Sequence, residues 1–269
     1  MSLPASDAHY AALLHQRLMP PRDGRLDVLS GLAHFSLITY ALPAERLRRY
    51  IPAERFDIPE FPINGQQLAL LSAVPFLDVD FHFIHLVPAL KWQFGQTNYR
   101  VYVFDKHTQQ HAVWFFGTTL GSWVVHVARG LWGIPWHPAT YTVQCDYDVA
   151  ERRYSHYSYR VRSRWAAAEV ELEDSGQPVQ AVEGFASFAA MQLILTHPVD
   201  GFYHHRSGRM GSYSVWHEPI TMTTGQARQA YFSLFERLEL LSRAEMQQPH
   251  SVLIAPLTTF RVLLPPHLL

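Results

Sequence analysis

The sequence predicts an α+β fold in which a β-rich, twisted antiparallel sheet closes towards a barrel, with a few helices packed around it. The first observation is the number of segments in which apolar and polar residues alternate as in strands, spread over residues 34–264. The second is the small number of helical segments, which are inserted singly between those strands. The third is the lack of an internal repeat or low-complexity linker, which predicts a single domain over residues 1–269.

Helical spacing or helix-end signals define the expected helices, which are 7–18, 43–51, 122–133 and 185–195. Segment 122–133 has the clearest ends, with Ser122 as the expected N-cap and Gly133 as the stop. The expected strands are 34–42, 67–77, 91–104, 111–120, 139–149, 153–163, 166–174, 211–224 and 250–264. Two of them, 91–104 and 111–120, form a hairpin around the polar loop DKHTQQ.

Composition narrows the classes of function. The formal net charge is −1 with no basic run, which disfavours nucleic-acid binding because phosphate neutralisation needs clustered Lys and Arg. The start MSLPASDAHY lacks the basic and apolar regions of a secretory signal, and no stretch has the ~18 apolar residues of a membrane helix. The single cysteine, Cys145, fits a reducing compartment. We therefore expect a cytoplasmic protein that binds neither nucleic acid nor membranes.

A polar stripe runs along the first hairpin strand. Side chains alternate between the faces of a strand, so Gln96, Asn98, Arg100 and Tyr102 share one face. The neighbouring strand, HAVWFFGTTL, is apolar or small on both faces, which favours a stripe that points into a barrel over one that faces solvent. Inside a barrel, Arg100 would need a partner, because burying an unpaired charge is costly.

A second polar stripe lies on the helix expected at 122–133, where Ser122, His126 and Arg129 recur on one side. Two interpretations stay open. Either the stripe is the solvent-exposed edge of a packed helix, or the planar guanidinium of Arg129 binds a carboxylate through two parallel hydrogen bonds.

The sequence GIPWHPAT holds Trp136 and His137 between two prolines, which predicts a stiff turn that presents both side chains. An imidazole titrates near neutral pH, so His137 is the strongest candidate for a general acid or base.

Sixteen histidines raise the question of a metal site. Two groups stand out, Asp78, Asp80 and His82 on one expected strand face, and His197, Asp200, His204 and His205 along the chain. Neither group has a recognised metal-ligand spacing. Nucleophile elbows, Walker loops and dinucleotide fingerprints are also missing, so we expect neither a metal nor a cofactor.

The segment 94–141 resembles an uncharacterised bacterial family, the YqjF-like domain of unknown function, which is grouped with the acetoacetate-decarboxylase-like superfamily. The matching motifs are Asn98-x-Arg100-x-Tyr102-Val103, then Ala128-Arg129, then Gly133-Ile134-Pro135-Trp136, with His217 in VWHEP downstream. The resemblance covers residues 28–265 and implies a closed or nearly closed β-barrel around a cavity with peripheral helices. Residues 1–27 would then be a helical N-terminal extension.

For the chemistry, the resemblance first implies a Schiff-base lysine, as in decarboxylase relatives. In those relatives the lysines follow a Gly-x-Pro, where this chain has Trp136 and His137 instead. The chain has only two lysines, Lys91 and Lys106, and both lie elsewhere in the sequence. The acidic residue usual two positions before the strand Asn is also replaced, by Gln96. We therefore expect no iminium chemistry at the family position.

Our leading hypothesis is a barrel whose lumen binds a small organic acid or carbonyl compound and carries out a lyase, hydratase or isomerase step without covalent catalysis. Arg100 and Arg129 would hold the anionic end, with His137 as acid or base and Trp136 as a pocket wall. The other substrate-binding candidates are Gln96, Asn98, Tyr102 and His217. The alternatives are a non-catalytic binding or sensing barrel and a barrel filled by its own side chains. Association into a homo-oligomer stays open.

Overall fold

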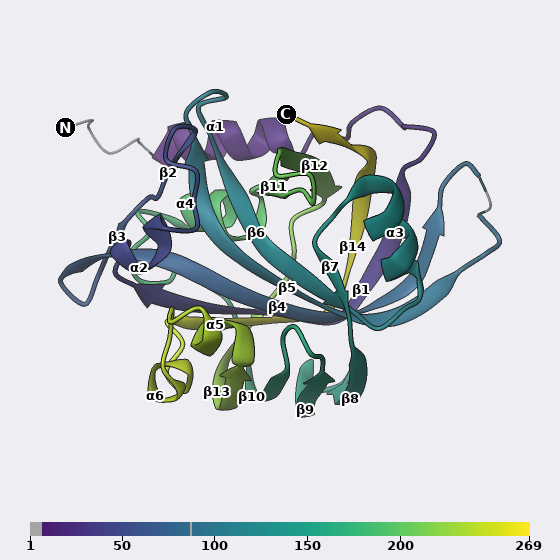
Figure 1. Ribbon diagram of the computed structural model, residues 1–269. Helices are drawn as coiled ribbons and strands as arrows, with labels where there is room; N and C mark the ends of the chain where they lie inside the picture. Colours follow the sequence, from purple (N-terminus) through teal and green to yellow (C-terminus); the bar gives the residue numbers. More distant parts are fainter. Residues whose placement is uncertain (1–6, 87) are drawn as a thin grey trace.

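The computed structural model describes residues 7–86 and 88–269, so the first six residues of the expected N-terminal extension 1–27 lie outside the described part. Long strands curl into a closed barrel, and a smaller open sheet packs against one side of it (Figure 1). In Figure 1 the open sheet lies below the barrel, and helix α1 lies above the barrel. The α+β, β-rich class predicted from the sequence is confirmed.

The strands are β1 (Val28–Leu42), β2 (Phe56–Asp57), β3 (Phe61–Ile63), β4 (Gln66–Phe83), β5 (Trp92–Asp105), β6 (Gln110–Leu120), β7 (Trp136–Pro138), β8 (Thr140–Asp148), β9 (Arg153–Arg162), β10 (Ala168–Pro178), β11 (Asp200–His204), β12 (Met210–His217), β13 (Thr223–Phe232) and β14 (Ser251–Leu268). The helices are α1 (Asp7–Arg17), α2 (Glu45–Arg48), α3 (Val124–Trp132), α4 (Phe188–Met191), the π-helical turn η1 (Gln192–Thr196), α5 (Ser233–Arg237) and α6 (Arg243–Met246).

The barrel consists of the seven strands β1-β4-β5-β6-β11-β12-β14, and the pairing of β14 with β1 closes the ring. Its strand pairs are antiparallel except β6 with β11, which are parallel, so the barrel is mixed rather than wholly antiparallel. The long strand β14 also pairs with β13, and the sheet continues from there through β10 and β9 to β8. One strand thus belongs to both the barrel and the open sheet.

Strand alternation divides the side chains of the barrel between two cores. On β5, for example, Tyr99 and Val101 point outwards into a core shared with the open sheet. Arg100 points the other way, into the barrel, as does Tyr102. We call the outer set of buried residues the packed core. It is rich in aromatic rings from both layers, such as Phe232 of β13, whose ring lies 6.1 Å from that of Tyr99.

A β-bulge in β6 sets which residues of that strand face inwards. Tyr99 pairs with Gly117 while Arg100 pairs with Phe115, so Phe116 is an extra residue on β6. Gly117 has a φ of +152°, which an L side chain rarely adopts, and a Cβ there would lie 2.7 Å from Trp165. Thr118 therefore faces the barrel interior beside Asn98, to which it donates a hydrogen bond of 2.8 Å.

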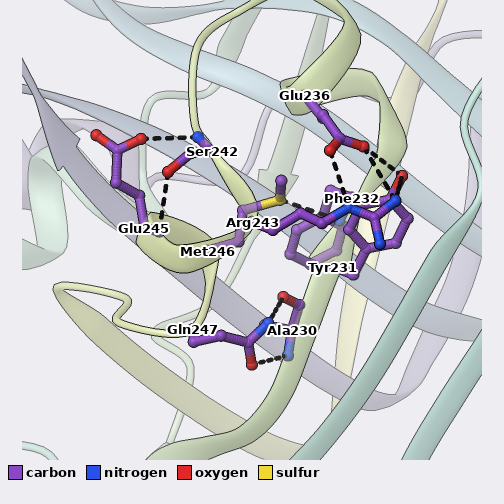
Figure 2. Close-up of polar contacts among 9 residues, drawn as sticks. All are labelled: Ala230, Tyr231, Phe232, Glu236, Ser242, Arg243, Glu245, Met246 and Gln247. Carbon is purple, nitrogen blue, oxygen red and sulfur yellow. Dashed lines mark hydrogen bonds and ion pairs between the residues drawn. The ribbon is translucent and has the colours of Figure 1, made fainter.

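The chain between β13 and β14 is fastened onto the open sheet by a local polar network (Figure 2). Ser242 and Glu245 form a reciprocal capping box at the start of α6. At its end, the side chain of Gln247 bonds both the backbone N–H and the carbonyl of Ala230. These contacts hold the segment beside β13.

Most predicted elements are present, with three informative differences. The helix expected at 185–195 is a short α-helix followed by the π-helical turn η1. The strand expected at 211–224 ends at His217, and β13 begins at Thr223. The turn expected at GIPWHPAT contains the strand β7, which pairs in parallel with β6. Of the helices in the described residues, none is long and apolar enough to cross a membrane.

Candidate functional site

The barrel encloses a cavity of about 100 Å³. Its wall is mainly aliphatic and aromatic, with Phe76, Phe115 and Phe260 among the lining residues. The polar side chains in the wall are Ser30, Asp78, Gln96, Asn98, Arg100, Thr196 and Tyr213. An apolar pocket with a few converging polar groups is the usual form of a small-molecule site.

Three members of the polar stripe lie on this wall, namely Gln96, Asn98 and Arg100 of β5. The side-chain oxygen of Asn98 accepts hydrogen bonds from Gln96 Nε2 at 3.0 Å and from Thr118 Oγ1 at 2.8 Å. Two donors on one oxygen fix the orientation of the Asn98 amide. Its NH₂ group, which has no hydrogen-bond partner among the described residues, remains as a donor for a ligand.

Arg100 is the only cationic side chain of the cavity wall within the described part of the chain. Its Nη2 donates to the backbone carbonyl of Leu195 at 2.8 Å, and its guanidinium lies 5.4 Å from the centre of the Tyr102 ring. Its Nε is buried without a hydrogen-bond partner, and no described carboxylate lies within ion-pair distance. The cavity wall therefore carries a partly buried positive charge for which no described carboxylate serves as counterion.

Asp78 is a cavity residue whose role the sequence did not reveal. Asp78, Asp80 and His82 were expected on one face, but the ladder with β5 is irregular between Asp78 and Phe81, and Asp80 has a φ of 54°. As a result Asp78 faces the cavity, whereas Asp80 is exposed and pairs with Lys91.

The Asp78 carboxyl accepts a hydrogen bond from Ser30 Oγ at 2.7 Å, and its Oδ2 is buried without a partner. Burial raises the pKa of Asp78 to about 7, and the hydrogen bond from Ser30 partly opposes this shift. A carboxyl with such a pKa can hold or release a proton near neutral pH.

Two other candidates, Tyr102 and His217, are buried next to the cavity but do not line it. The Tyr102 hydroxyl lies 2.9 Å from Ser72 Oγ and accepts a long hydrogen bond of 3.5 Å from Arg100 Nη2. Tyr102 therefore helps to position the guanidinium without lining the cavity. His217 has both ring nitrogens 2.8 Å from backbone carbonyls, those of Glu218 and Thr196. Burial lowers its pKa, and its ring is occupied in holding Thr196.

Trp136 and His137 do not face the same space, because β7 is a strand and its side chains alternate. Trp136 lines the cavity, whereas His137 lies on the outer side, stacked on Trp165 with ring centres 3.9 Å apart. Burial, and then the charges of Arg129 and Arg237, lower the pKa of His137 to about 4. Arg129 is exposed on α3 beside His137, so the structure separates it from Arg100.

Neither lysine of the chain lines the cavity. Lys91 is exposed, and Lys106 lies near Asp57 at the edge of β2. The described residues also contain no cluster of three or more His, Cys, Asp or Glu side chains that could hold a metal ion. The arrangement therefore offers a guanidinium, amides, hydroxyls and one titratable carboxyl, without an amine nucleophile.

Several solved structures share this fold over nearly their whole length. The enduracididine biosynthesis enzyme MppR, in complex with pyruvate, has a TM-score of 0.57 and 14% sequence identity, and the match covers 99% of this chain and 96% of that one. Acetoacetate decarboxylase from Legionella pneumophila has a TM-score of 0.52 and 11% identity, with 100% and 98% covered. An acetoacetate decarboxylase-like enzyme from Sphingomonas wittichii RW1 has a TM-score of 0.51 and 9% identity, with 89% and 92% covered.

At these identities the likeness concerns the fold alone, and it confirms the acetoacetate-decarboxylase-like barrel that the motifs implied. A search of curated protein sequences finds no match. A family model does match, over residues 30–259, and it is described as an uncharacterized conserved protein. The chain therefore belongs to the family of domain of unknown function 2071, DUF2071, whose fold is that of the acetoacetate-decarboxylase-like proteins.

Proposed function

We propose that the barrel cavity binds a small organic acid or carbonyl compound, with its anionic end on Arg100. The observation that carries this proposal is the half-buried guanidinium of Arg100, whose Nε is fully buried and which has no described carboxylate partner. A buried cation without a counterion is costly, and a bound carboxylate offsets that cost through charge-assisted hydrogen bonds. Asn98 and Gln96 would orient the remaining polar atoms of the ligand, and Trp136 would form part of the wall.

The size of the cavity limits the ligand. A cavity of about 150 Å³ admits benzene, which has six non-hydrogen atoms, so the 100 Å³ available here suits a molecule of at most about six non-hydrogen atoms. Pyruvate falls in this range, and it is the compound bound in the MppR structure. We expect this function in the cytoplasm, where a lone thiol such as Cys145 stays reduced.

Calorimetric titration with pyruvate and with pyruvamide, its neutral analogue, tests the binding step. The wild-type protein should bind pyruvate, bind pyruvamide at least about tenfold more weakly, and lose most pyruvate affinity in Arg100→Met. Equal affinities for the acid and the amide, or an unchanged affinity in Arg100→Met, would contradict the proposal.

For a catalytic step, we propose Asp78 as the group that transfers a proton. It is the carboxyl in the cavity wall and has a pKa near neutrality, whereas His137 faces away from the cavity. Asp78 would take a proton from the carbon next to the ligand's carbonyl group and return one, as in a lyase, hydratase or isomerase reaction. This step needs no covalent intermediate, which suits a cavity wall without lysine.

Hydrogen exchange tests this step without knowledge of the natural substrate. In D₂O, proton transfer by Asp78 would make the wild-type protein speed the loss of the pyruvate methyl proton signal, while Asp78→Asn would bind pyruvate without speeding the exchange. If the wild-type exchange equals that of buffer while pyruvate still binds, the second candidate function, non-catalytic binding or sensing, is supported instead. The distance between Arg100 and Asp78 favours this non-catalytic candidate for very small ligands, because such a ligand bound to Arg100 would not reach Asp78. Asp78 lies six residues from Ser72, the partner of Arg100, which is roughly 20 Å along a strand.

A further inference from the structure

A second concave site lies on the outside of the barrel, where α3 and β7 face the end of β11. This outer groove has a volume of about 290 Å³ and is lined by Arg129, His137, His204 and Arg206 together with Gly133 and Pro135. It shares only Ile134 with the lining of the cavity, and it lies on the opposite face of β7 from Trp136. The outer groove is therefore a separate site from the cavity.

The charge of the outer groove is not balanced. Its lining has two guanidinium groups and two imidazoles but no acidic residue. The side chain of Arg129 makes no hydrogen bond or ion pair with any described residue, and that of Arg206 donates only to the carbonyl of Gly130, at 3.1 Å. Some surface arginines, such as Arg228 and Arg243, pair with a glutamate, whereas others, such as Arg162, have no ion pair among the described residues but do not lie in this groove. Two arginines left without a carboxylate in one concave site indicate a place for an external anion.

His137 is held firmly in this groove. Its ring stacks on Trp165 with an angle of only 5° between the planes. The ring of Trp165 can come this close because Gly117 has no side chain. Neither ring nitrogen of His137 has a hydrogen-bond partner within the described part of the chain. The imidazole is thus positioned by stacking alone, and its polar atoms remain available to a ligand.

We propose that the outer groove binds a phosphoryl group, as inorganic phosphate or as a phosphate monoester. Arginine forks match phosphate oxygens in pairs, and a tetrahedral dianion has enough acceptor oxygens for two guanidiniums and an imidazole at once. A monocarboxylate has only two oxygens and one charge, so it would make fewer hydrogen bonds here than phosphate. At such an exposed site, water and salt also weaken the attraction between a single negative charge and the arginines. The volume of the groove leaves room for the organic part of a monoester.

Titration with inorganic phosphate at low ionic strength, followed by calorimetry, tests this proposal. We expect saturable 1:1 binding that weakens about tenfold or more in Arg129→Gln and in Arg206→Gln. Both residues are exposed, so these variants should keep the thermal unfolding temperature of the wild type. The matched control is Arg162→Gln, which removes the same charge from the exposed face of β9 and should leave phosphate binding unchanged.

A second readout is the titration of His137, followed by NMR of its imidazole protons. Bound phosphate is a nearby negative charge, so it should raise the pKa of His137 from its depressed value near 4. Phenyl phosphate tests the monoester form. If it binds more tightly than phosphate, the organic part also contacts the groove, whereas weaker binding identifies the free ion as the ligand.

Two results would overturn the proposal. One is the absence of saturable phosphate binding at millimolar concentrations, and the other is an equal loss of binding in Arg162→Gln and Arg129→Gln. The Arg100→Met variant separates this site from the cavity, since it should lose pyruvate binding and retain phosphate binding. Each proposal can therefore fail without the other.

Discussion

The barrel cavity and the packed core are built from opposite faces of the same strands, yet they are filled in different ways. In the packed core, rings from the barrel and from the open sheet pack against one another, and tyrosine hydroxyls supply polar groups. The hydroxyl of Tyr40, for instance, donates to the carbonyl of Met246 at 2.8 Å. In the cavity, space remains open, and the wall carries the charged Arg100 and the titratable Asp78, each with a buried atom that lacks a partner.

The packed core thus holds apolar and aromatic side chains in mutual contact, whereas the cavity leaves space between its walls. We infer that the open space on the other face of β4 and β5, with a guanidinium and a carboxyl in its wall, belongs to a binding site, as proposed above. Four predictions can break or sharpen the comparison.

The largest effect is expected from Phe232→Ala in the packed core. Phe232 is fully buried, and its ring contacts those of Tyr40, Tyr99 and Phe235. The truncation leaves a void that rigid neighbours cannot fill, so the free energy of unfolding should fall by about 3–5 kcal/mol. Urea unfolding measures the loss. A loss below about 1 kcal/mol would show that this core is loosely packed.

Unlike Phe232→Ala, the substitution Asp78→Asn should increase the free energy of unfolding at high pH. The pKa of Asp78 is about 7 in the folded protein, against an ordinary value of 3.8. Between these pH values the folded protein holds a proton that the unfolded chain has released, so wild-type stability falls as the pH rises from 4 towards 7.

The asparagine variant lacks this titration and should be more stable than the wild type at pH 8, by roughly 4 kcal/mol at most. At pH 4 the two proteins should be nearly equal in this respect. Urea unfolding at both pH values checks the sign. A variant that is less stable than the wild type at pH 8 would contradict the burial of this carboxyl.

A matched valine pair compares the two regions directly. Val170 lies in the packed core and Val74 lines the cavity, and both are almost fully shielded from solvent. Val170→Ala should cost about 2 kcal/mol of unfolding free energy. Val74→Ala should cost about half as much, because one side of Val74 already borders open space and has fewer contacts to lose. Equal losses in urea unfolding would mean that the cavity wall is packed as tightly as the core.

The smallest effect on stability is expected from Thr118→Val, which removes one donor from the Asn98 oxygen. The loss should be about 1 kcal/mol, but pyruvate affinity should also fall because the Asn98 amide is less firmly oriented. The control is Thr119→Val on the opposite face, where the hydroxyl lies 2.7 Å from that of Tyr141. It should cost similar stability and leave pyruvate affinity unchanged. If both variants lose affinity equally, Thr118 has no specific role.

The sequence predicted the parts of the site that depend on local periodicity. Alternation along β5 was enough to group Gln96, Asn98 and Arg100 on one face, and the apolar neighbouring strand indicated that this face was covered. The antiparallel strands β8 to β10 were predicted for the same reason, because their exposed and buried residues alternate regularly. The order of strands around the barrel, including the parallel pair β6 and β11, depends on pairing between distant segments.

Bulges and distant pairings explain what the sequence did not reveal. Asp78 was grouped with Asp80 because an irregular ladder at this point leaves no mark in the pattern of residues. Trp136 and His137 were expected to be presented together in a turn, since prolines flank them. Pairing with β6 makes the segment a strand instead, and this pairing sends the two side chains to opposite sides.

The most direct test of the central claim is a crystal structure of the protein grown with pyruvate, determined for the wild type and for Arg100→Met. The account predicts electron density for pyruvate inside the barrel, with its carboxylate within hydrogen-bond distance of the Arg100 guanidinium, and an empty cavity in the variant. Pyruvate bound only in the outer groove, or density in the cavity that is unchanged in Arg100→Met, would contradict it.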